Sequence, residues 1–180
     1  MPEYAAFLRG INVGGHRITS ADLRARFKEI GFRDVNVFQA SGNVVFDRDG
    51  GPVAKIGARI EKGLEAALGY DVAVFLRKAS EVRAIARQQP FAPAVVEASR
   101  GKLQVAMLLT RPEAGEQEEV LALGSEEDRL AFGDRELYWL PSGGLLESAL
   151  DLKAIGKVVG ATTVRTKGTV ERLAAKHFGA

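Results

Sequence analysis

The 180-residue sequence contains no cysteine and only two histidines, His16 and His177. Without cysteine the chain cannot form a disulfide, a thiolate nucleophile or a Cys-ligated zinc site, which fits a reducing compartment. Two histidines leave little for a His-rich metal centre. The sequence therefore predicts no metal site, and no motif in it indicates a cofactor.

Long hydrophobic runs are also missing. No stretch approaches the roughly 18 apolar residues of a membrane span, and the N-terminus lacks the basic and apolar segments of a signal peptide. We therefore expect a cytoplasmic protein with no membrane contact. The charge excess is small, since 25 basic residues are nearly matched by 23 acidic ones. This balance permits nucleic-acid binding without indicating it.

The first half of the sequence has the pattern of a βαββαβ unit. Apolar stretches predict strands at 4–11, 35–38, 44–46 and 72–76, and helical spacing predicts helices at 20–30 and 52–68. Thr19 or Ser20 can cap the first helix, and Gly31 and Gly69 stand where the two helices should end. Residues 39–42 are expected to turn a hairpin between the second and third strands.

The second half repeats this order at an offset of somewhat under 100 residues. Strands are predicted at 103–109, 129–132 and 136–140, and helices at 112–123, 150–159 and 169–178, while a helix predicted at 80–88 ends the first half. Residues 89–101 contain two prolines and show no sustained hydrophobic periodicity. We therefore predict an N-terminal half at 1–88, a connecting segment at 89–101 and a C-terminal half at 102–180, arranged as tandem structural repeats.

This order of elements predicts an α+β fold with two ferredoxin-like halves. Right-handed crossovers place both helices of a βαββαβ unit on one face of an antiparallel sheet. The first and third strands are then neighbours. As a result, residues 9–12 and residues 41–43 are expected to meet at one edge of the first sheet.

Residues 10–15 form a glycine-rich loop between a strand and a helix. In this setting backbone N–H groups can bind phosphate or carboxylate, and Gly14 and Gly15 permit the positive φ angles that such loops use. The spacing matches neither a dinucleotide-binding nor a Walker motif, so the sequence gives poor support for those ligands. The alternative is a plain tight turn.

Four polar residues flank this loop or the predicted hairpin turn. Arg9 interrupts an apolar strand, where an interior guanidinium would need a structural partner or a ligand. Asn12 lies within the loop. Ser41 and Asn43 are two residues apart, so in an extended segment they face the same way and can share a ligand, or they simply form the turn.

Residues 162–169 bring hydroxyl groups and two cations, Arg165 and Lys167, to the start of the last predicted helix. This arrangement suggests a second place for an anion, with Thr169 as a plain helix cap as the alternative. Elsewhere, no nucleophile elbow, HExxH or EF-hand motif occurs. Whether the protein is an enzyme stays undecided.

Five segments carry a resemblance to a known family: FLRGINVGGH, GF-x-x-V, SGNVVF, LYWLPSGG and TTVRTKGTVERL. Together they resemble the bacterial DUF1697 family of uncharacterised proteins. The resemblance implies two ferredoxin-like parts and brings no established activity. The family ending usually reads Thr-Arg-Asn-Trp-x-Thr; here Arg165 and Thr169 match, while Thr166 and Lys167 replace the Asn and the Trp.

The leading hypothesis is a protein that binds a small anionic or nucleotide-like ligand at the edge formed by the glycine-rich loop and the hairpin turn. The predicted ligand contacts are Arg9, Asn12, Gly14, Gly15, Ser41, Asn43 and Arg165. The alternatives are an enzyme that uses the same cluster, a nucleic-acid-binding module, and a protein-interaction unit built around Trp139. The sequence does not indicate an oligomeric state.

Overall fold

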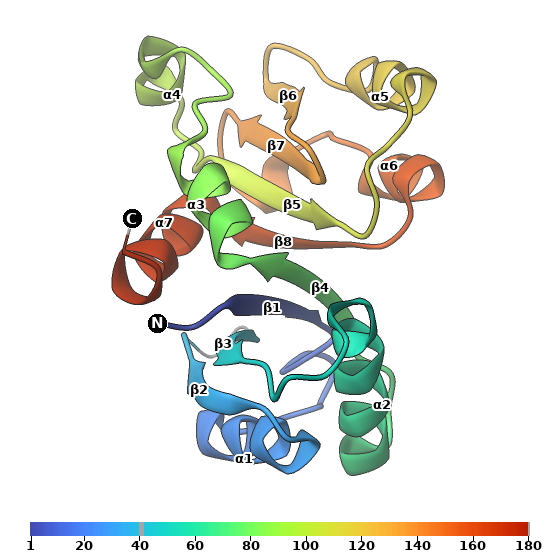
Figure 1. The fold of residues 1–180 in the computed structure, drawn as a ribbon. Helices are drawn as coiled ribbons and strands as arrows, with labels where there is room; N and C mark the ends of the chain where they lie inside the picture. The colour runs from blue at the N-terminus through green and yellow to red at the C-terminus, as the bar shows by residue number, and fades with distance from the viewer. Residues whose placement is uncertain (40–41, 180) are drawn as a thin grey trace. The chain divides into compact units, whose positions relative to one another are not determined.

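The structure is a computed structural model, and it describes residues 1–39 and 42–179 (Figure 1). The predicted α+β fold is confirmed: two four-stranded antiparallel sheets carry helices, in the strand orders β2-β3-β1-β4 and β6-β7-β5-β8. The chain divides into two compact units. Unit 1 holds Met1–Arg83 and the stretch that begins at Leu173, and unit 2 holds Ala84–Arg172.

Unit 1 contains the predicted βαββαβ order. Its elements are β1 (Tyr4–Arg9), α1 (Ser20–Ile30), β2 (Arg33–Val37), β3 (Asn43–Asp47), η1 (Val53–Lys55), α2 (Ile56–Leu68) and β4 (Ala73–Lys78), followed by α3 (Ala79–Arg87). Strand β1 lies between β3 and β4, antiparallel to both, with Phe7 opposite Asn43. The predicted pairing of the first and third strands is therefore confirmed.

Local sequence signals set both ends of α1 and the C-terminal end of α2. The Thr19 hydroxyl accepts a hydrogen bond from the Asp22 backbone N–H at 3.1 Å, which caps α1. Helix α1 ends at Gly31 with φ 112°, and α2 ends at Gly69 with φ 79°. Glycine adopts these left-handed angles without the steric cost that a Cβ would add.

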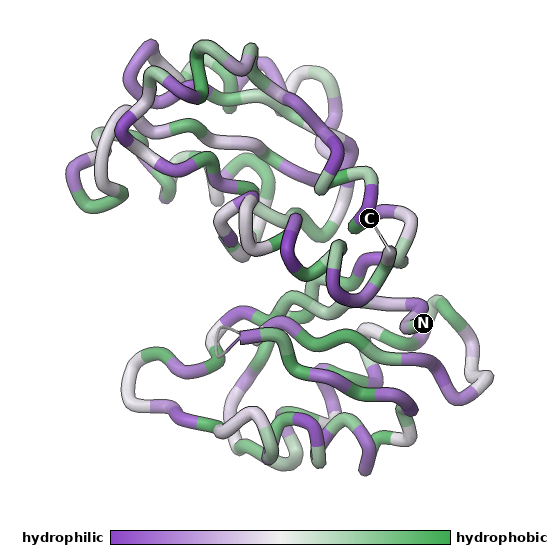
Figure 2. Tube along the Cα trace, turned by 90° about the vertical axis from the view of Figure 1, so that its left-hand side faces the viewer, coloured by the Kyte–Doolittle hydropathy of each residue, from purple (hydrophilic) through white to green (hydrophobic). Residues whose placement is uncertain are grey.

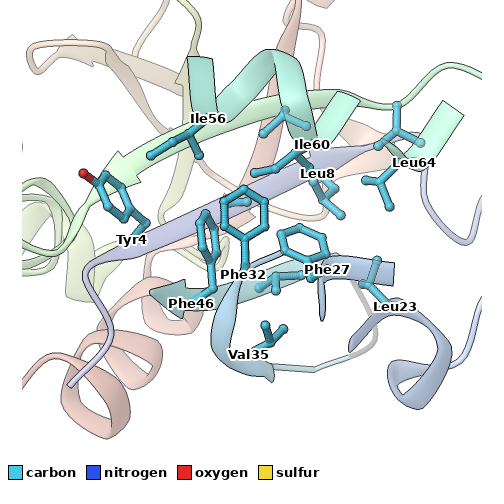
Figure 3. Packing of buried hydrophobic residues seen from close by; sticks show 14 of the residues in the cluster. Tyr4, Leu8, Leu23, Phe27, Phe32, Val35, Phe46, Ile56, Ile60 and Leu64 are labelled. Carbon is cyan, nitrogen blue, oxygen red and sulfur yellow. The ribbon is translucent and has the colours of Figure 1, made fainter. Parts of the chain in front are cut away.

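The core of unit 1 lies between the sheet and helices α1 and α2. Rings from α1, β3 and the connection between α1 and β2 meet there, with the Phe46 ring centred 4.6 Å from the Phe32 ring and 5.5 Å from the Phe27 ring (Figure 3). Ile60 of α2 and Leu8 of β1 are also buried in this cluster. Along the chain, hydrophobic positions are interspersed with hydrophilic ones (Figure 2). Burial of this apolar surface is the main favourable contribution to folding.

Unit 2 repeats the strand order of unit 1. Its elements are α4 (Pro93–Ala98), β5 (Gln104–Leu108), α5 (Ala114–Leu121), β6 (Asp128–Phe132), β7 (Glu136–Pro141), η2 (Leu145–Glu147), α6 (Leu152–Val159) and β8 (Thr162–Thr166), followed by α7 (Lys167–His177). A smaller apolar cluster, including Val120 of α5 and Ile155 of α6, covers one face of this sheet.

Two segments differ from the sequence-based expectation. Residues 89–101 were expected to be irregular, but they contain α4, because Pro93 stands at the start of the helix, where a missing N–H costs nothing. Residues 162–166 were expected to be a polar segment before a helix, but they form β8. In that strand Thr163 and Arg165 are buried, so the polar residues point inward at alternate positions. Among the described residues, no helix is long and apolar enough to cross a membrane.

Candidate functional site

The glycine-rich loop after β1 has an unusual backbone. Gly10, Asn12, Gly14 and Gly15 have φ angles of 87°, 55°, 57° and 87°. Alternation of left-handed and ordinary backbone angles turns successive N–H groups toward one side, which is the arrangement of anion-binding nests in other proteins. The loop geometry is therefore compatible with the predicted anion site.

Asn12 holds this loop in shape. Its Oδ1 accepts a hydrogen bond from the Ile18 backbone N–H at 2.8 Å, which closes the loop across six residues. A second turn forms where the His16 N–H donates to the Val13 carbonyl at 2.9 Å. Asn tolerates the left-handed region better than other residues with a side chain. The described contacts of the Asn12 side chain therefore support the backbone of the loop.

Gly14 and Gly15 lie exposed at the tip of the loop. A Cβ added at either residue would meet nothing within 4 Å, so the surrounding space is open. Both residues have positive φ angles, which glycine permits. Space and backbone conformation together leave these two peptide units available to a ligand.

Arg9 is not the interior arginine that the sequence led us to expect. Strand β1 ends at this residue, and its side chain is exposed, whereas the five preceding residues of the strand are buried. Among the described residues, none forms a hydrogen bond or an ion pair with its guanidinium. The group therefore stands at the entrance of the glycine-rich loop with its donors facing solvent.

An aromatic pair lies at the far end of the same loop. The His16 ring stacks on the Tyr70 ring with centroids 3.8 Å apart and planes at 28°. Arg17 follows and donates from Nη1 to the His16 carbonyl at 2.8 Å. His16 and Arg17 are both exposed. The loop therefore presents two cationic side chains, Arg9 and Arg17, and one exposed imidazole.

The predicted meeting of the loop with the hairpin is confirmed by backbone contacts. The Leu8 N–H donates to the Gly42 carbonyl at 2.8 Å. A Cβ at Gly42 would come 3.1 Å from Leu8 Cβ and 3.5 Å from Ile11 Cβ, so the two segments approach closely. Ser41 lies outside the described residues.

Asn43 is fully buried rather than open to solvent. The side-chain Nδ2 of Asn43 donates to the Phe38 backbone carbonyl at 3.0 Å, and the backbone carbonyl of Asn43 accepts from the Phe38 N–H at 2.8 Å. Both bonds join the two sides of the β2–β3 hairpin. Asn43 directly follows Gly42, and its burial gives it a structural role in the hairpin.

Arg165 belongs to unit 2, whereas the other predicted contacts belong to unit 1. Its Nη1 donates to the Thr163 hydroxyl at 2.7 Å and to the Val164 carbonyl at 2.9 Å, so the guanidinium is held along its own strand. Burial lowers the pKa of Arg165 to about 10. At neutral pH the group keeps its charge, because that value is still far above 7.

The cap of the last helix also differs from the expectation. The Thr166 hydroxyl, and not that of Thr169, accepts the capping bond, from the Thr169 N–H at 3.1 Å. Lys167 is buried and donates from Nζ to the Glu171 carboxylate at 2.6 Å and to the Ala86 carbonyl at 2.9 Å. Both cations of this segment thus have partners within unit 2.

The aromatic residues considered for stacking or docking are buried. Phe7 and Phe46 have no exposed surface, and Trp139 is 4% exposed. The Trp139 Nε1 donates to the Asp128 carboxylate at 2.9 Å, which satisfies its polar atom inside the unit. This burial leaves Phe7 and Phe46 no surface on which an RNA base could stack, and it does not agree with the expected protein-interaction role of Trp139.

His177 packs in unit 1, where its ring lies nearly perpendicular to the Phe38 ring, with the ring centroids 6.0 Å apart. Burial, with a smaller effect from Lys176, lowers the pKa of His177 below its usual 6.5. Among the described residues, no group of three or more histidine, aspartate or glutamate side chains could hold a metal ion.

Sequence reasoning missed one cavity in unit 2. It has a volume of about 440 Å³ and lies where α4 faces the β6–β7 hairpin, with Arg100 and Arg129 among its lining residues. These arginines are 29 positions apart and belong to no recognisable motif. The only sequence feature that bears on this cavity is Arg129 in the strand predicted at 129–132, and an arginine is ordinary on the solvated face of a sheet.

Comparison with known proteins places the chain in a family. The family model described as "Protein of unknown function (DUF1697)" matches residues 1–138. The chain belongs to the DUF1697 family. The suspected membership is thereby confirmed, and the description of DUF1697 assigns no activity. No curated protein matches the chain.

Among solved structures, the chain is similar to the conserved bacterial protein SP0830 from Streptococcus pneumoniae. The two share 18% sequence identity and a TM-score of 0.70, and the match covers 98% of each chain. At this identity the likeness shows a common fold across nearly the whole chain. The ligand and the reaction, if there is one, have to be argued from the residues themselves.

Proposed function

We propose that this DUF1697 protein binds a small anionic or nucleotide-like ligand at the loop after β1, through Arg9 and the peptide groups of Gly14 and Gly15. The observation that carries the proposal is the exposed Arg9 guanidinium, which has no hydrogen-bond or ion-pair partner among the described residues and directly precedes the glycine-rich loop. Guanidinium groups and backbone N–H groups are the donors that proteins commonly use for phosphate and carboxylate.

The surrounding structure supports a prepared site. Asn12 fixes the loop through its bond to the Ile18 N–H, and Gly42 packs against Leu8 beneath it. A loop that is already held in shape loses less conformational freedom when a ligand binds. The flat His16 ring, stacked on Tyr70, adds a surface on which a nucleobase can lie, which is the reason to include nucleotides among the ligands.

Titration of the purified protein with inorganic phosphate, AMP, ATP and citrate tests this proposal. A ligand at 100 times its dissociation constant should raise the free energy of unfolding by about 2.7 kcal/mol, which a thermal-shift assay detects. Arg9→Ala should weaken binding about tenfold or more, because a hydrogen bond to a charged group contributes about 1.5–3 kcal/mol. Arg24→Ala is the matched control, since Arg24 is an exposed arginine of the same unit on α1.

Each outcome has a separate meaning. Binding that is lost in Arg9→Ala and kept in Arg24→Ala supports the loop as the site. Equal loss in both variants would instead reflect a general charge effect. Binding of short RNA with a steep salt dependence, and no binding of the small anions, would replace the proposal by a nucleic-acid-binding function.

A further inference from the structure

The cavity in unit 2 has an apolar body. Ala94, Val95 and Ala98 of α4 form one side of it, and Leu140 of β7 contributes to the other. Its volume of about 440 Å³ is within the range of roughly 300–1,000 Å³ that small-molecule sites occupy. Apolar lining of this kind favours a ligand that removes hydrocarbon surface from water.

Charged groups stand at the edge of this cavity. Arg100 follows α4, Arg129 lies on β6, and Glu126 precedes that strand. Both arginine side chains are exposed, and among the described residues none forms a hydrogen bond or an ion pair with either guanidinium. Two cations and one carboxylate leave a net charge of +1 at the edge of the cavity. This charge balances one negative group and would repel a second cation.

The wall that carries Arg100 is fixed to the end of β7. The Ser99 hydroxyl donates to the Pro141 carbonyl at 2.5 Å and accepts from the Gly101 N–H at 3.1 Å. Gly101 has no room for a side chain, because a Cβ there would overlap the carbonyl oxygens of Pro141 and Gly143. The short α4 segment is thus held against the hairpin, so the cavity exists before any ligand arrives.

We propose that this cavity binds a monocarboxylate with an apolar tail. The guanidinium groups of Arg100 and Arg129 hold the carboxylate, and the alanine and leucine side chains cover the tail. Arginine suits this task because its planar donors match the two oxygens of a carboxylate. A single negative charge fits the net charge of the edge better than a dianion, which Glu126 would oppose. The site is independent of the loop that follows β1.

The experiment uses the full chain and three small probes: octanoate, octylamine and acetate. Amide chemical shifts in two-dimensional NMR locate each probe and give its dissociation constant, even for weak binding. Octanoate should move the signals of residues 93–101 and 126–142. Octylamine has the same tail with the opposite charge, and acetate has the head without the tail, so both should bind at least tenfold more weakly.

Variants then separate the head site from the tail site. Arg100→Ala and Arg129→Ala should each weaken octanoate binding about tenfold. Arg111→Ala is the matched control, because the Arg111 side chain is 71% exposed in the same unit and forms an ion pair with Asp134, which does not line the cavity. Ala98→Phe should abolish octanoate binding by filling the cavity. Ala94→Leu fills less of the cavity and replaces Ala98→Phe if the phenylalanine ring disturbs α4.

Several results would overturn the proposal. One is an absence of octanoate shifts at residues 93–101 and 126–142, and another is equal binding of octylamine or acetate. Unchanged affinity in the double variant Arg100→Ala, Arg129→Ala would also overturn it. Arg9→Ala should leave octanoate binding unaltered, so failure of this proposal is distinguishable from failure of the anion site in unit 1.

Discussion

Asn43 and Glu136 hold equivalent places in the two sheets, since Asn43 begins β3 and Glu136 begins β7, and both are buried. The backbone carbonyl of each residue accepts a hydrogen bond across its hairpin. The donor is the Phe38 N–H in unit 1 and the Gly133 N–H in unit 2, and the distance is 2.8 Å in both cases. The two hairpins differ in length, yet each keeps a buried polar residue at this position. A buried polar side chain stabilises a hairpin only when its own donors and acceptors are also hydrogen-bonded.

Replacement of Asn43 should therefore destabilise the fold. Asn43→Ala removes the donor to the Phe38 carbonyl in a buried site, and we expect the free energy of unfolding to fall by about 1–3 kcal/mol. Urea unfolding followed by circular dichroism measures this change. Asn36→Ala, which removes an exposed bond to the Asp34 carbonyl, serves as control and should cost less than about 0.5 kcal/mol. Equal costs would show that burial is not the cause.

Gly42→Ala tests the close approach beneath the glycine-rich loop. Gly42 has φ 79°, and an added Cβ would lie 3.1 Å from Leu8 Cβ, so both backbone strain and crowding oppose the substitution. Strain alone costs about 1–2 kcal/mol. Gly50→Ala isolates the strain, because Gly50 has φ 94° and open space around it. Gly42→Ala should lower the melting temperature more than Gly50→Ala does, and the reverse order would contradict the contact with Leu8.

The ion pair between Asp49 and Arg59 predicts a specific pH dependence. Arg59 donates to both carboxylate oxygens, at 3.0 and 2.8 Å. These bonds, with a smaller effect from the Gly51 N–H, lower the pKa of Asp49 from 3.8 to about 2. Because the folded-state pKa is below the unfolded one, the carboxylate stabilises the protein above about pH 4 and loses this effect as the pH falls toward 2.

Asp49→Asn measures that effect. The variant should be less stable than the natural protein at pH 7, and the difference should vanish as the pH approaches 2. Denaturant unfolding at a series of pH values gives the comparison. Glu29→Gln is the control, since the Arg26–Glu29 pair is more exposed, with 61% of the Glu29 side chain accessible. A difference that stays constant down to pH 2 would contradict the assignment.

Asp128 should control the environment of the single tryptophan. Its carboxylate accepts from Trp139 Nε1 at 2.9 Å and from the Ser148 hydroxyl at 2.6 Å. Asp128→Ala leaves a buried indole N–H without its acceptor, so we expect a loss of about 1.5–3 kcal/mol and a changed tryptophan emission spectrum. Since Trp139 is the only tryptophan, the spectrum reports on this site alone. Ser148→Ala keeps the indole bond and should leave the spectrum nearly unchanged.

Both ends of α1, the end of α2 and the strand order of unit 1 were predictable because they depend on local signals. Thr19 can cap a helix from its chemistry alone, and Gly31 and Gly69 mark helix ends by their freedom to adopt positive φ. Strand β8 was missed for the opposite reason. Its buried positions include Thr163 and Arg165, so the hydrophobic alternation that identifies a strand is absent.

The candidate site was only partly predictable. The glycine-rich loop could be recognised by its composition, but exposure decides which of its residues can meet a ligand, and exposure is a property of the whole fold. Arg9 turned out to be exposed and Asn43 buried, although both are polar residues at strand ends. The cavity beside Arg100 and Arg129 could not be found at all, because it depends on how α4 packs against a hairpin distant in sequence.

Unit 1 draws its residues from both ends of the sequence, with Met1–Arg83 at one end and the stretch from Leu173 at the other. A ribosome makes the chain in order from the N-terminus. All of unit 2 has therefore left the ribosome before the last residues of unit 1 are available. The βαββαβ core can assemble early, but its last helical segment is added only when translation of these residues is complete.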